Sequence, residues 1–161
     1  MSKPGEVRRL PDGPVVLDAS FLIALLDGED TAQRFASILT RGVVPAATAG
    51  EVFYKLHAAA GIDPAQFEDG LRALGIDLVD LSVAAARHFP ALKAVDALRR
   101  EQLRAAGVRP VQTLSLGDLC CLGYAATAGL PVLTGNRHWT TLQPLGLPIA
   151  IYNFRDPAAA P

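Results

Sequence analysis

The stretch VVLDASFLIALLDG, Val15–Gly28, predicts the kind of fold. Its first three residues form a short apolar run, which is typical of a buried strand. The remainder predicts a helix that ends at Gly28, because glycine commonly terminates helices. Asp18 stands where the strand gives way to the helix. The stretch is therefore a strand–helix unit with a carboxylate at its junction.

The same alternation continues along the rest of the chain. Further short apolar runs predict strands at residues 43–45, 76–81, 131–134 and 147–152. Between the strands we predict a helix that a capping box at residues 30–33 opens, a helix at 48–61 and another that starts at Pro64. A long helical stretch at 83–106 with a break near Pro90 follows, and then an apolar helix that begins at Asp118. Strands that alternate with helices indicate an α/β fold with a parallel sheet of five strands covered on both faces.

The length and charge of the chain limit its organisation. Its 161 residues suit one domain, which we expect to span residues 14–155, between a flexible arm at 1–13 and a disordered tail at 156–161. The net charge of −1 gives no global basic excess. Any nucleic-acid site must therefore arise from local placement of cations.

The two cysteines and the apolar runs exclude several other classes. Cys120 and Cys121 are adjacent within an apolar stretch, so we expect two buried thiols, and neither a disulfide framework nor a zinc site. Residues 1–13 have no apolar core of the secretory kind, and the run from Phe21 to Leu26 is too short to span a membrane. We therefore expect a cytoplasmic protein with no membrane partner.

Three acids and one amide fall where strands end or helices begin. Asp18 follows the first strand, Glu51 lies in the first turn of the helix after the second, Asp118 opens the apolar helix, and Asn136 follows the fourth strand. In a parallel sheet the carboxyl ends of strands and the amino ends of the crossover helices lie at one edge. We therefore expect these four side chains to meet there.

Each acid also has a purely structural explanation. Thr48-x-x-Glu51 fits a capping box, Ser115-x-x-Asp118 is close to one, and Asp18 can cap its own helix. Taken together the acids are harder to explain in this way, because three neighbouring carboxylates repel and raise one another's pKa unless a cation neutralises them. Hard oxygen ligands of this kind suit Mg²⁺ or Mn²⁺.

Four segments carry a resemblance to a known family. VVLDAS, AGEVFYKL, LSLGDLCCLGYA and PVLTGNRHW resemble, in this order and spacing, the successive motifs of PIN-domain ribonucleases, above all the VapC toxins of bacterial toxin–antitoxin pairs. Each motif alone is weak, but the four together cover about residues 14–155. The resemblance implies a PIN-like three-layer α/β/α fold and metal-dependent hydrolysis of RNA, whether transfer, ribosomal or messenger RNA.

The resemblance also implies roles for individual residues. Asp18, Glu51 and Asp118 match the acidic metal ligands of the family, which implies Mg²⁺ or Mn²⁺ as cofactor. Ser20 and Thr134 match its supporting hydroxyl residues. The position of Asn136 is usually Asp in this family, so here the fourth ligand offers an oxygen without a charge.

Partners and substrate contacts follow in part from the resemblance. It implies a cognate VapB-like antitoxin and a homodimer. Arg137 and His138 flank Asn136, and we expect them to contact RNA phosphates. The stretch from Val83 to Arg109 has a local excess of +4, and we regard a solvated helix face as its simplest explanation, with tracking of RNA as the alternative.

Two alternatives compete with the nuclease interpretation. A haloacid-dehalogenase-like phosphatase also begins with a strand and an Asp, but it requires a second Asp where this chain has Ser20. The stronger alternative is a PIN domain with a weakened site that only binds RNA or protein, which Asn136 alone favours. Dinucleotide-binding and P-loop motifs are absent from the sequence.

Overall fold

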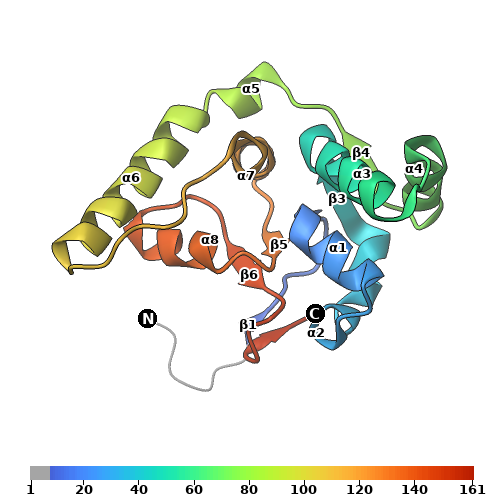
Figure 1. Ribbon diagram of the computed structural model, residues 1–161, viewed down its shortest axis with the longest axis horizontal. Coiled ribbons are helices and arrows are strands. Elements are labelled where there is room, and N and C mark those ends of the chain that lie inside the picture. The colour runs from blue at the N-terminus through green and yellow to red at the C-terminus, as the bar shows by residue number, and fades with distance from the viewer. Residues whose placement is uncertain (1–7) are drawn as a thin grey trace.

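Val15–Leu17 form β2, the middle strand of a five-stranded sheet in the computed structural model, which describes residues 8–161 (Figure 1). The strand order is β4-β3-β2-β5-β6, and every pair of neighbours is parallel. The other strands are β3 (Gly42–Pro45), β4 (Asp77–Val79), β5 (Val132–Thr134) and β6 (Ile151–Asn153). The predicted parallel sheet of five strands is confirmed.

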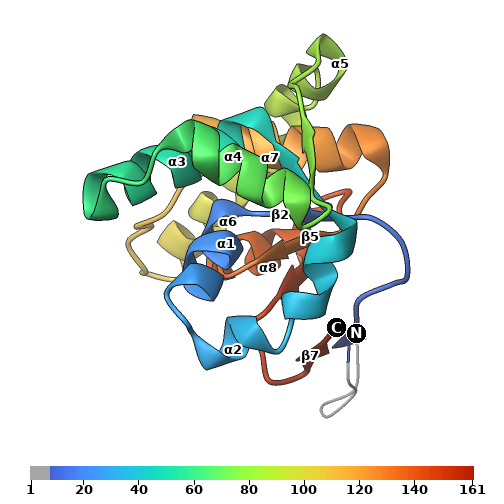
Figure 2. The ribbon, with the colours of Figure 1, turned by 90° about the vertical axis from the view of Figure 1, so that its right-hand side faces the viewer.

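Helices cover both faces of the sheet. Successive residues of β2 point to opposite faces, and because all three are apolar, each face needs a covering layer. Val15 and Leu17 pack into one apolar cluster and Val16 into another. The first cluster includes α1 (Ala19–Leu26), α3 (Ala46–Ala60) and α4 (Pro64–Ala73), and Figure 2 shows these helices on one side of the molecule. The second includes α6 (Phe89–Ala105), α7 (Leu116–Ala128) and α8 (Arg137–Leu142). This is the predicted three-layer α/β/α arrangement.

The helix expected after Gly28 is shorter than its pattern suggested. α2 (Asp30–Gln33) is a single turn followed by a 3₁₀ helix, η1 (Ala36–Arg41). The capping box predicted at Asp30 is wrong, because Glu29 is the N-cap residue and makes no side-chain cap bond. The Glu29 carboxylate instead binds Thr31 and Arg155.

The long helical stretch is broken where expected. α5 (Val83–Ala86) ends before α6 begins at Phe89, so that Pro90 lies in the first turn of α6, where proline is tolerated. A second short 3₁₀ helix, η2 (Gln143–Leu145), follows α8. Both cysteines are buried free thiols in α7, as predicted. Within residues 8–161, no helix has the length and apolar character needed to cross a membrane.

The two ends of the chain differ from the expectation of a flexible arm and a disordered tail. β1 (Arg8–Arg9) pairs in parallel with β7 (Ala159–Ala160), and the two lie side by side in Figure 1. Leu10 is only 3% exposed and packs into the first core cluster, which anchors this pairing. The rest of the predicted arm, residues 1–7, lies outside the described residues.

Candidate active site

Asp18 is fixed at the junction of β2 and α1 by bonds to one of its two oxygens. It is the N-cap residue of α1, and its Oδ2 accepts hydrogen bonds from the Ser20 N–H and hydroxyl and from Thr134 Oγ1, the last at 2.8 Å. Its Oδ1 accepts no hydrogen bond from residues 8–161. Asp18 is only 8% exposed, but its Oδ1 is not fully buried and can still contact solvent.

The two hydroxyl groups tie the loop after β5 to Asp18. Ser20 Oγ accepts from the Gly135 N–H at 2.8 Å and donates to Asp18. Thr134 Oγ1 accepts from the Asn136 N–H at 2.9 Å and also donates to Asp18. Because each hydroxyl uses its proton on Asp18 and its lone pair on the loop, the carboxylate and Asn136 are held in one network.

Asp118 caps the helix that it opens. The Ser115 N–H donates to Asp118 Oδ2 at 2.8 Å, and the Asp118 N–H donates to Ser115 Oγ at 3.1 Å, which completes a capping box. The structural alternative for Asp118 is therefore correct. The capping box uses only Oδ2 of Asp118, however, and no described residue donates a hydrogen bond to Oδ1.

Glu51 lies one turn further into its helix than predicted. α3 begins at Ala46, and Thr48 is buried inside it, so the predicted Thr48–Glu51 capping box is wrong. Glu51 Oε1 accepts a hydrogen bond from Lys55 Nζ at 2.6 Å. Its Oε2 lies 3.7 Å from the place that a Cβ on Gly117 would occupy, so the side chain faces the start of α7.

The three carboxylates interact electrostatically. Burial raises the pKa of Asp18, and the charges of Asp118 and Glu51 raise it further against the hydrogen bonds that lower it. The pKa of Asp118 is also raised, first by burial and then by Glu51, and this outweighs the bonds from Ser115. The acids therefore lie near enough for charge on one to affect the pKa of another, and their joint role as metal ligands stays a prediction.

The carboxylates do not, however, form a closed ligand set in this arrangement. Across residues 8–161, no three His, Cys, Asp or Glu side chains are close enough together to hold a metal ion. Asp18, Asp118 and Glu51 nevertheless each keep one oxygen without a hydrogen bond from the described residues. Since Mg²⁺ commonly takes only one or two protein carboxylates and retains several waters, this donor set fits a hard divalent cation.

Asn136 and its two neighbours have different environments. Asn136 Oδ1 accepts from the His138 N–H at 3.0 Å and caps α8, so this oxygen already has a structural role. Arg137 is exposed and lines the hollow beside Ser20 and Asn136. His138 is only 7% exposed, and its Nε2 lies 2.7 Å from Asp96 Oδ1. Its burial removes His138 from the surface where we expected a phosphate contact.

Asp96 is a buried polar residue that sequence reasoning missed. It is 1% exposed and accepts hydrogen bonds from Thr113 Oγ1 at 2.6 Å and from the Leu114 N–H at 3.2 Å, besides its contact with His138. Burial alone would raise the pKa of Asp96, but these hydrogen bonds outweigh it and lower the pKa. The residue links α6 to the segment before Asp118 and to α8.

Lys55 was also missed, although its signal was visible. Its spacing of four residues after Glu51 is the one that allows an ion pair on a helix. The hydrogen bond to Glu51 raises the pKa of Lys55. Asp96 offered no such signal, because an acid in a charged helix is ordinarily solvated.

Most of this chain matches a known protein family. The family model of the PIN domain matches residues 15–143. The chain belongs to the PIN-domain family. The carboxylate cluster therefore lies within the matched part, and the resemblance seen in the sequence motifs is confirmed.

Solved structures similar to this PIN domain include several VapBC complexes. DNA-bound VapBC from Salmonella typhimurium is 20% identical with a TM-score of 0.57, over 88% of this chain and 98% of that one. VapBC-5 from Mycobacterium tuberculosis is 26% identical with a TM-score of 0.54, over the same shares. VapC20 from Mycobacterium tuberculosis, described as a toxin that cleaves the sarcin–ricin loop, is 16% identical with a TM-score of 0.53, over 82% and 95%. No curated protein matches the chain.

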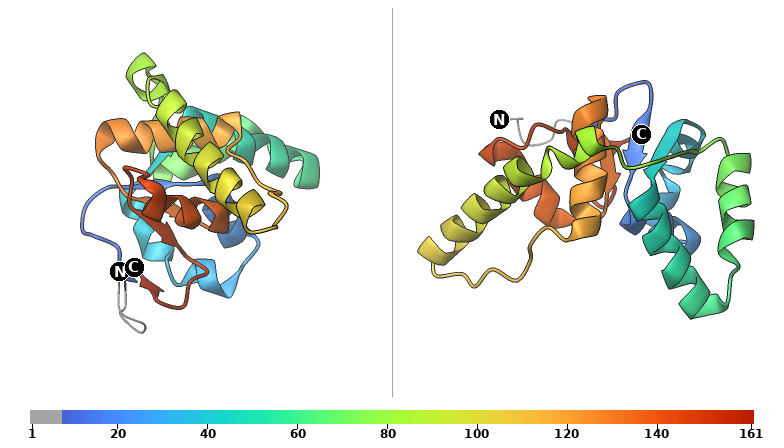
Figure 3. Two further views of the ribbon diagram at one scale, coloured as in Figure 1. Left: turned by 90° about the vertical axis from the view of Figure 1, so that its left-hand side faces the viewer. Right: turned by 90° about the horizontal axis from the view of Figure 1, so that it is seen from above.

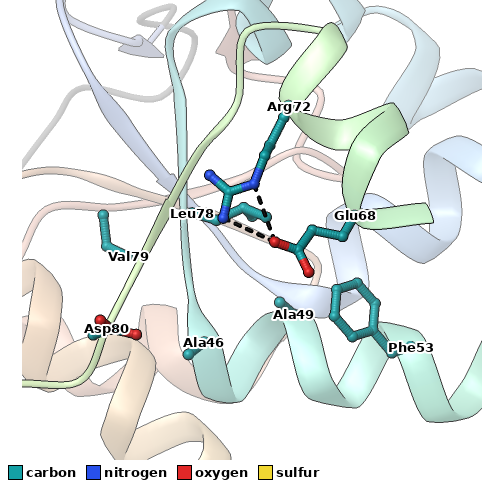
Figure 4. Close-up of a pocket in the computed structure, with 8 residues that line it drawn as sticks. All are labelled: Ala46, Ala49, Phe53, Glu68, Arg72, Leu78, Val79 and Asp80. Carbon is teal, nitrogen blue, oxygen red and sulfur yellow. Dashed lines mark hydrogen bonds and ion pairs between the residues drawn. The ribbon is translucent and has the colours of Figure 1, made fainter. Parts of the chain in front are cut away.

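A further hollow in this PIN domain lies between α3, α4 and β4 (Figure 4). Glu68 and Arg72 lie one turn apart on α4 at its rim, and the Glu68 carboxylate accepts from Arg72 at 2.9 and 3.1 Å. Because these charges neutralise one another, the hollow offers no excess cation for a phosphate. We assign it no part in the candidate site.

Proposed function

We propose that this PIN domain is an endoribonuclease that requires Mg²⁺ or Mn²⁺, and that it is the toxin of a VapBC-type pair. One observation carries the proposal. Asp18, Glu51 and Asp118 come from three separate elements, and each keeps an oxygen without a hydrogen bond from the described residues. The charge of Glu51 also raises the pKa of both aspartates. A purely structural role would engage these oxygens or keep the charges apart.

Each proposed carboxylate ligand is held in place by hydrogen bonds to one oxygen: Oδ2 in Asp18 and Asp118, and Oε1 in Glu51. Asp18 and Asp118 would hold the ion, with Glu51 and Asn136 completing the site. A bound divalent ion lowers the pKa of a water molecule and neutralises charge that builds up on the phosphate. Ser20, Thr134 and Ser115 fix the orientation of the two aspartates, so these do not have to be ordered when substrate binds.

The remaining side chains would act on substrate and water. Arg137 is exposed next to Asn136 and is placed to bind a phosphate oxygen. Glu51 Oε2 or Asp118 Oδ1, whichever of the two does not bind the ion, would orient the attacking water and accept its proton. Lys55 holds Glu51 Oε1 and thereby leaves Oε2 as the available atom.

The proposed partner is a cognate VapB-like antitoxin, since the similar structures include VapBC complexes. An apolar groove between α1, η1 and α4 suits an amphipathic segment of such a protein. It is lined by Leu22, Leu25, Leu26, Leu39, Phe67, Gly70, Leu71 and Leu74. We also propose that the toxin is a homodimer and acts in the cytoplasm.

The alternative function is a PIN domain that binds RNA or protein without cleaving it. Asn136 and the open spacing of the carboxylates favour this alternative. Dependence on metal separates the two, because only the nuclease needs a divalent ion. Asn136→Asp adds the missing charge and preserves the cap of α8, since Asp and Asn cap helices equally well.

The test is cleavage of total cellular RNA by the purified full-length protein without antitoxin. The reactions contain Mg²⁺, Mn²⁺ or EDTA, beside Asp118→Asn, whose amide oxygen can still accept from Ser115. The proposal predicts discrete fragments that require metal and are lost in the variant. Absence of cleavage by folded protein in every metal, with or without Asn136→Asp, would favour the binding module.

A further inference from the structure

A groove with three arginines leads away from the candidate site. It lies between α6, α8 and the segment that follows α6, elements that lie side by side in Figures 1 and 3. Its volume is about 250 Å³. Its lining contains no acid and consists of Arg99, Leu103, Val108, Arg109, Val111, Gln112, Arg137, His138 and Thr141.

The arginines of this groove lack acidic partners. Among residues 8–161, no ion pair involves Arg99, Arg109 or Arg137. The Nε of Arg99 is buried and has no hydrogen-bond partner in the same part of the chain. The three guanidinium groups thus keep their positive charge available to an anionic ligand.

The groove adjoins the part of the sheet edge that carries Asn136. A second hollow contains Ser20, Gly135 and Asn136, and it shares Gln112 and Arg137 with the groove. Ser20 and Asn136 belong to the network that holds Asp18. A chain that enters at the candidate site can therefore continue past Arg137 into the groove.

The other direction from Arg137 carries less available positive charge. A third hollow extends from Arg137 along β6 to Arg8 and Arg155, but Asp156 also lines it. The Arg155 guanidinium donates to both oxygens of Glu29 at 2.8 Å, which offsets its charge. The groove along α6 is thus the better path for a polyanion.

We propose that single-stranded RNA on one side of the scissile phosphate binds in this groove. Its phosphates contact Arg99, Arg109 and Arg137, and its bases rest on the apolar side chains of Leu103, Val108 and Val111. Val111 is 86% exposed and Val108 50%, so both offer apolar surface to an unstacked base. A duplex keeps its bases stacked inside and would not use this surface. The inference rests on the proposed nuclease function, which supplies RNA as the polyanion.

The structure separates Arg99 from the two other arginines of α6. Arg100 and Arg104 are also in α6 but do not line the groove, and Lys93 donates to Thr113 and to the Leu114 carbonyl. Of the six cations between Val83 and Arg109, only Arg99 and Arg109 line it. Arg100 and Arg104 therefore provide controls with the same charge and residue type.

The experiment measures binding of a fluorescent single-stranded RNA to the full-length protein by anisotropy, in EDTA and over a range of salt concentrations. We expect Arg99→Gln, Arg109→Gln and Arg137→Gln each to weaken binding about fivefold at 0.1 M salt and to lower the salt slope by about 0.7. Arg100→Gln and Arg104→Gln should change neither quantity. Circular dichroism confirms that each variant is folded.

Two results would overturn the proposal. If the groove and control variants weaken RNA binding equally, the RNA is attracted by the overall positive charge of this surface and not by the groove. If the groove variants bind RNA as the wild type does, RNA does not occupy the groove. Unchanged RNA binding would reject the proposal even if the same variants no longer bound the antitoxin. In that case the groove would be a protein-binding site. Binding in EDTA does not depend on cleavage, so failure of the nuclease function is detected separately by the cleavage assay.

Discussion

Asp18 and Asp118 each accept hydrogen bonds through only one of their two carboxylate oxygens. In both residues Oδ2 caps a helix, whereas Oδ1 accepts no hydrogen bond from the described residues. Capping and metal binding were alternatives when judged from the sequence. Capping does not exclude the proposed metal binding, because the capping hydrogen bonds use only Oδ2 and leave Oδ1 without a described donor.

Asp18→Asn tests the charge of Asp18 separately from its cap, because Asn caps a helix equally well. Burial raises the pKa of Asp18, so its ionised form destabilises the fold at neutral pH. In EDTA at pH 7 we expect the variant to melt about 2–4 °C higher than the wild type, as a gain of about 1 kcal/mol produces in a domain of this size. It should also lose RNA cleavage.

The pH dependence of this difference follows from the raised pKa. The folded protein binds the Asp18 proton more tightly than the unfolded chain, so the penalty is complete above the folded pKa and disappears as the pH falls toward 3.8. Melting curves of both proteins should therefore converge in acid. A variant that is less stable than the wild type at pH 7 would show that the charge is already compensated.

Asp96→Ala should destabilise the fold strongly, because it leaves His138 and Thr113 without their buried partner. We expect a loss of about 3 kcal/mol in the free energy of unfolding at pH 7, measured in urea. The pKa of Asp96 is lowered, so its contribution is complete above the ordinary carboxyl range and is lost as the pH falls through the folded pKa. The difference from wild type should therefore shrink below about pH 4.

Asp69→Ala is the matched control for Asp96. Asp69 is an exposed acid of α4, and its replacement should change the stability by no more than about 0.5 kcal/mol. Equal effects of the two substitutions would contradict the role assigned to the buried Asp96.

At the scale of elements, the sequence predicted the strands better than the helix starts. The apolar runs at Val15, Val43 and Val132 are strands because each is buried in a parallel sheet. The start of α3 was misplaced because Pro45 serves as its N-cap and the helix-favouring Ala46 and Ala47 extend it before Thr48. A capping pattern identifies a possible start, but packing against the sheet decides between neighbouring ones.

Gly123 is required by the packing of α5 against α7. A Cβ at this position would lie 2.6 Å from the carbonyl oxygen of Ala85 and 2.9 Å from Cε1 of Phe89. We expect Gly123→Ala to cost about 1–3 kcal/mol in the free energy of unfolding, despite the better helix propensity of alanine.

Gly50→Ala in α3 is the matched control, since a Cβ there would meet nothing within 4 Å. It should stabilise the protein by about 0.5–1 kcal/mol. Urea unfolding of both variants checks the pair, and a stabilising effect of Gly123→Ala would contradict the close contact between α5 and α7.

At the scale of the whole molecule, the contacts that sequence reasoning missed join distant segments. Asp96 and His138 are separated by 42 residues, and β1 and β7 join the two ends of the chain. Neither contact has a local pattern, whereas the edge with Asp18 and Asp118 follows from the topology of parallel sheets. For the same reason the sequence showed an excess of arginine but not which arginines face a groove.

The apolar groove between α1 and α4 provides a test of the proposed antitoxin partner. Leu74 lines this groove and is 53% exposed, so Leu74→Glu should leave the fold intact and weaken binding of the cognate antitoxin at least tenfold. Val83→Glu is the control, because Val83 is 75% exposed and lies on α5, away from the groove lining. Calorimetric titration with the antitoxin measures both, and equal affinity of the two variants would place the partner elsewhere.

The claim on which the function depends most is that Asp18, Glu51 and Asp118 together hold a divalent ion. The most direct test is a titration of the metal-free protein with Mn²⁺, followed by electron paramagnetic resonance, beside Asp18→Asn, Asp118→Asn and Lys55→Gln. The first two variants remove proposed ligands, and the third leaves all three carboxylates in place. We predict saturable binding by the wild type and by Lys55→Gln, and binding at least tenfold weaker in both aspartate variants. Wild-type binding that is no tighter than that of the aspartate variants, in protein shown to be folded, would contradict the metal site.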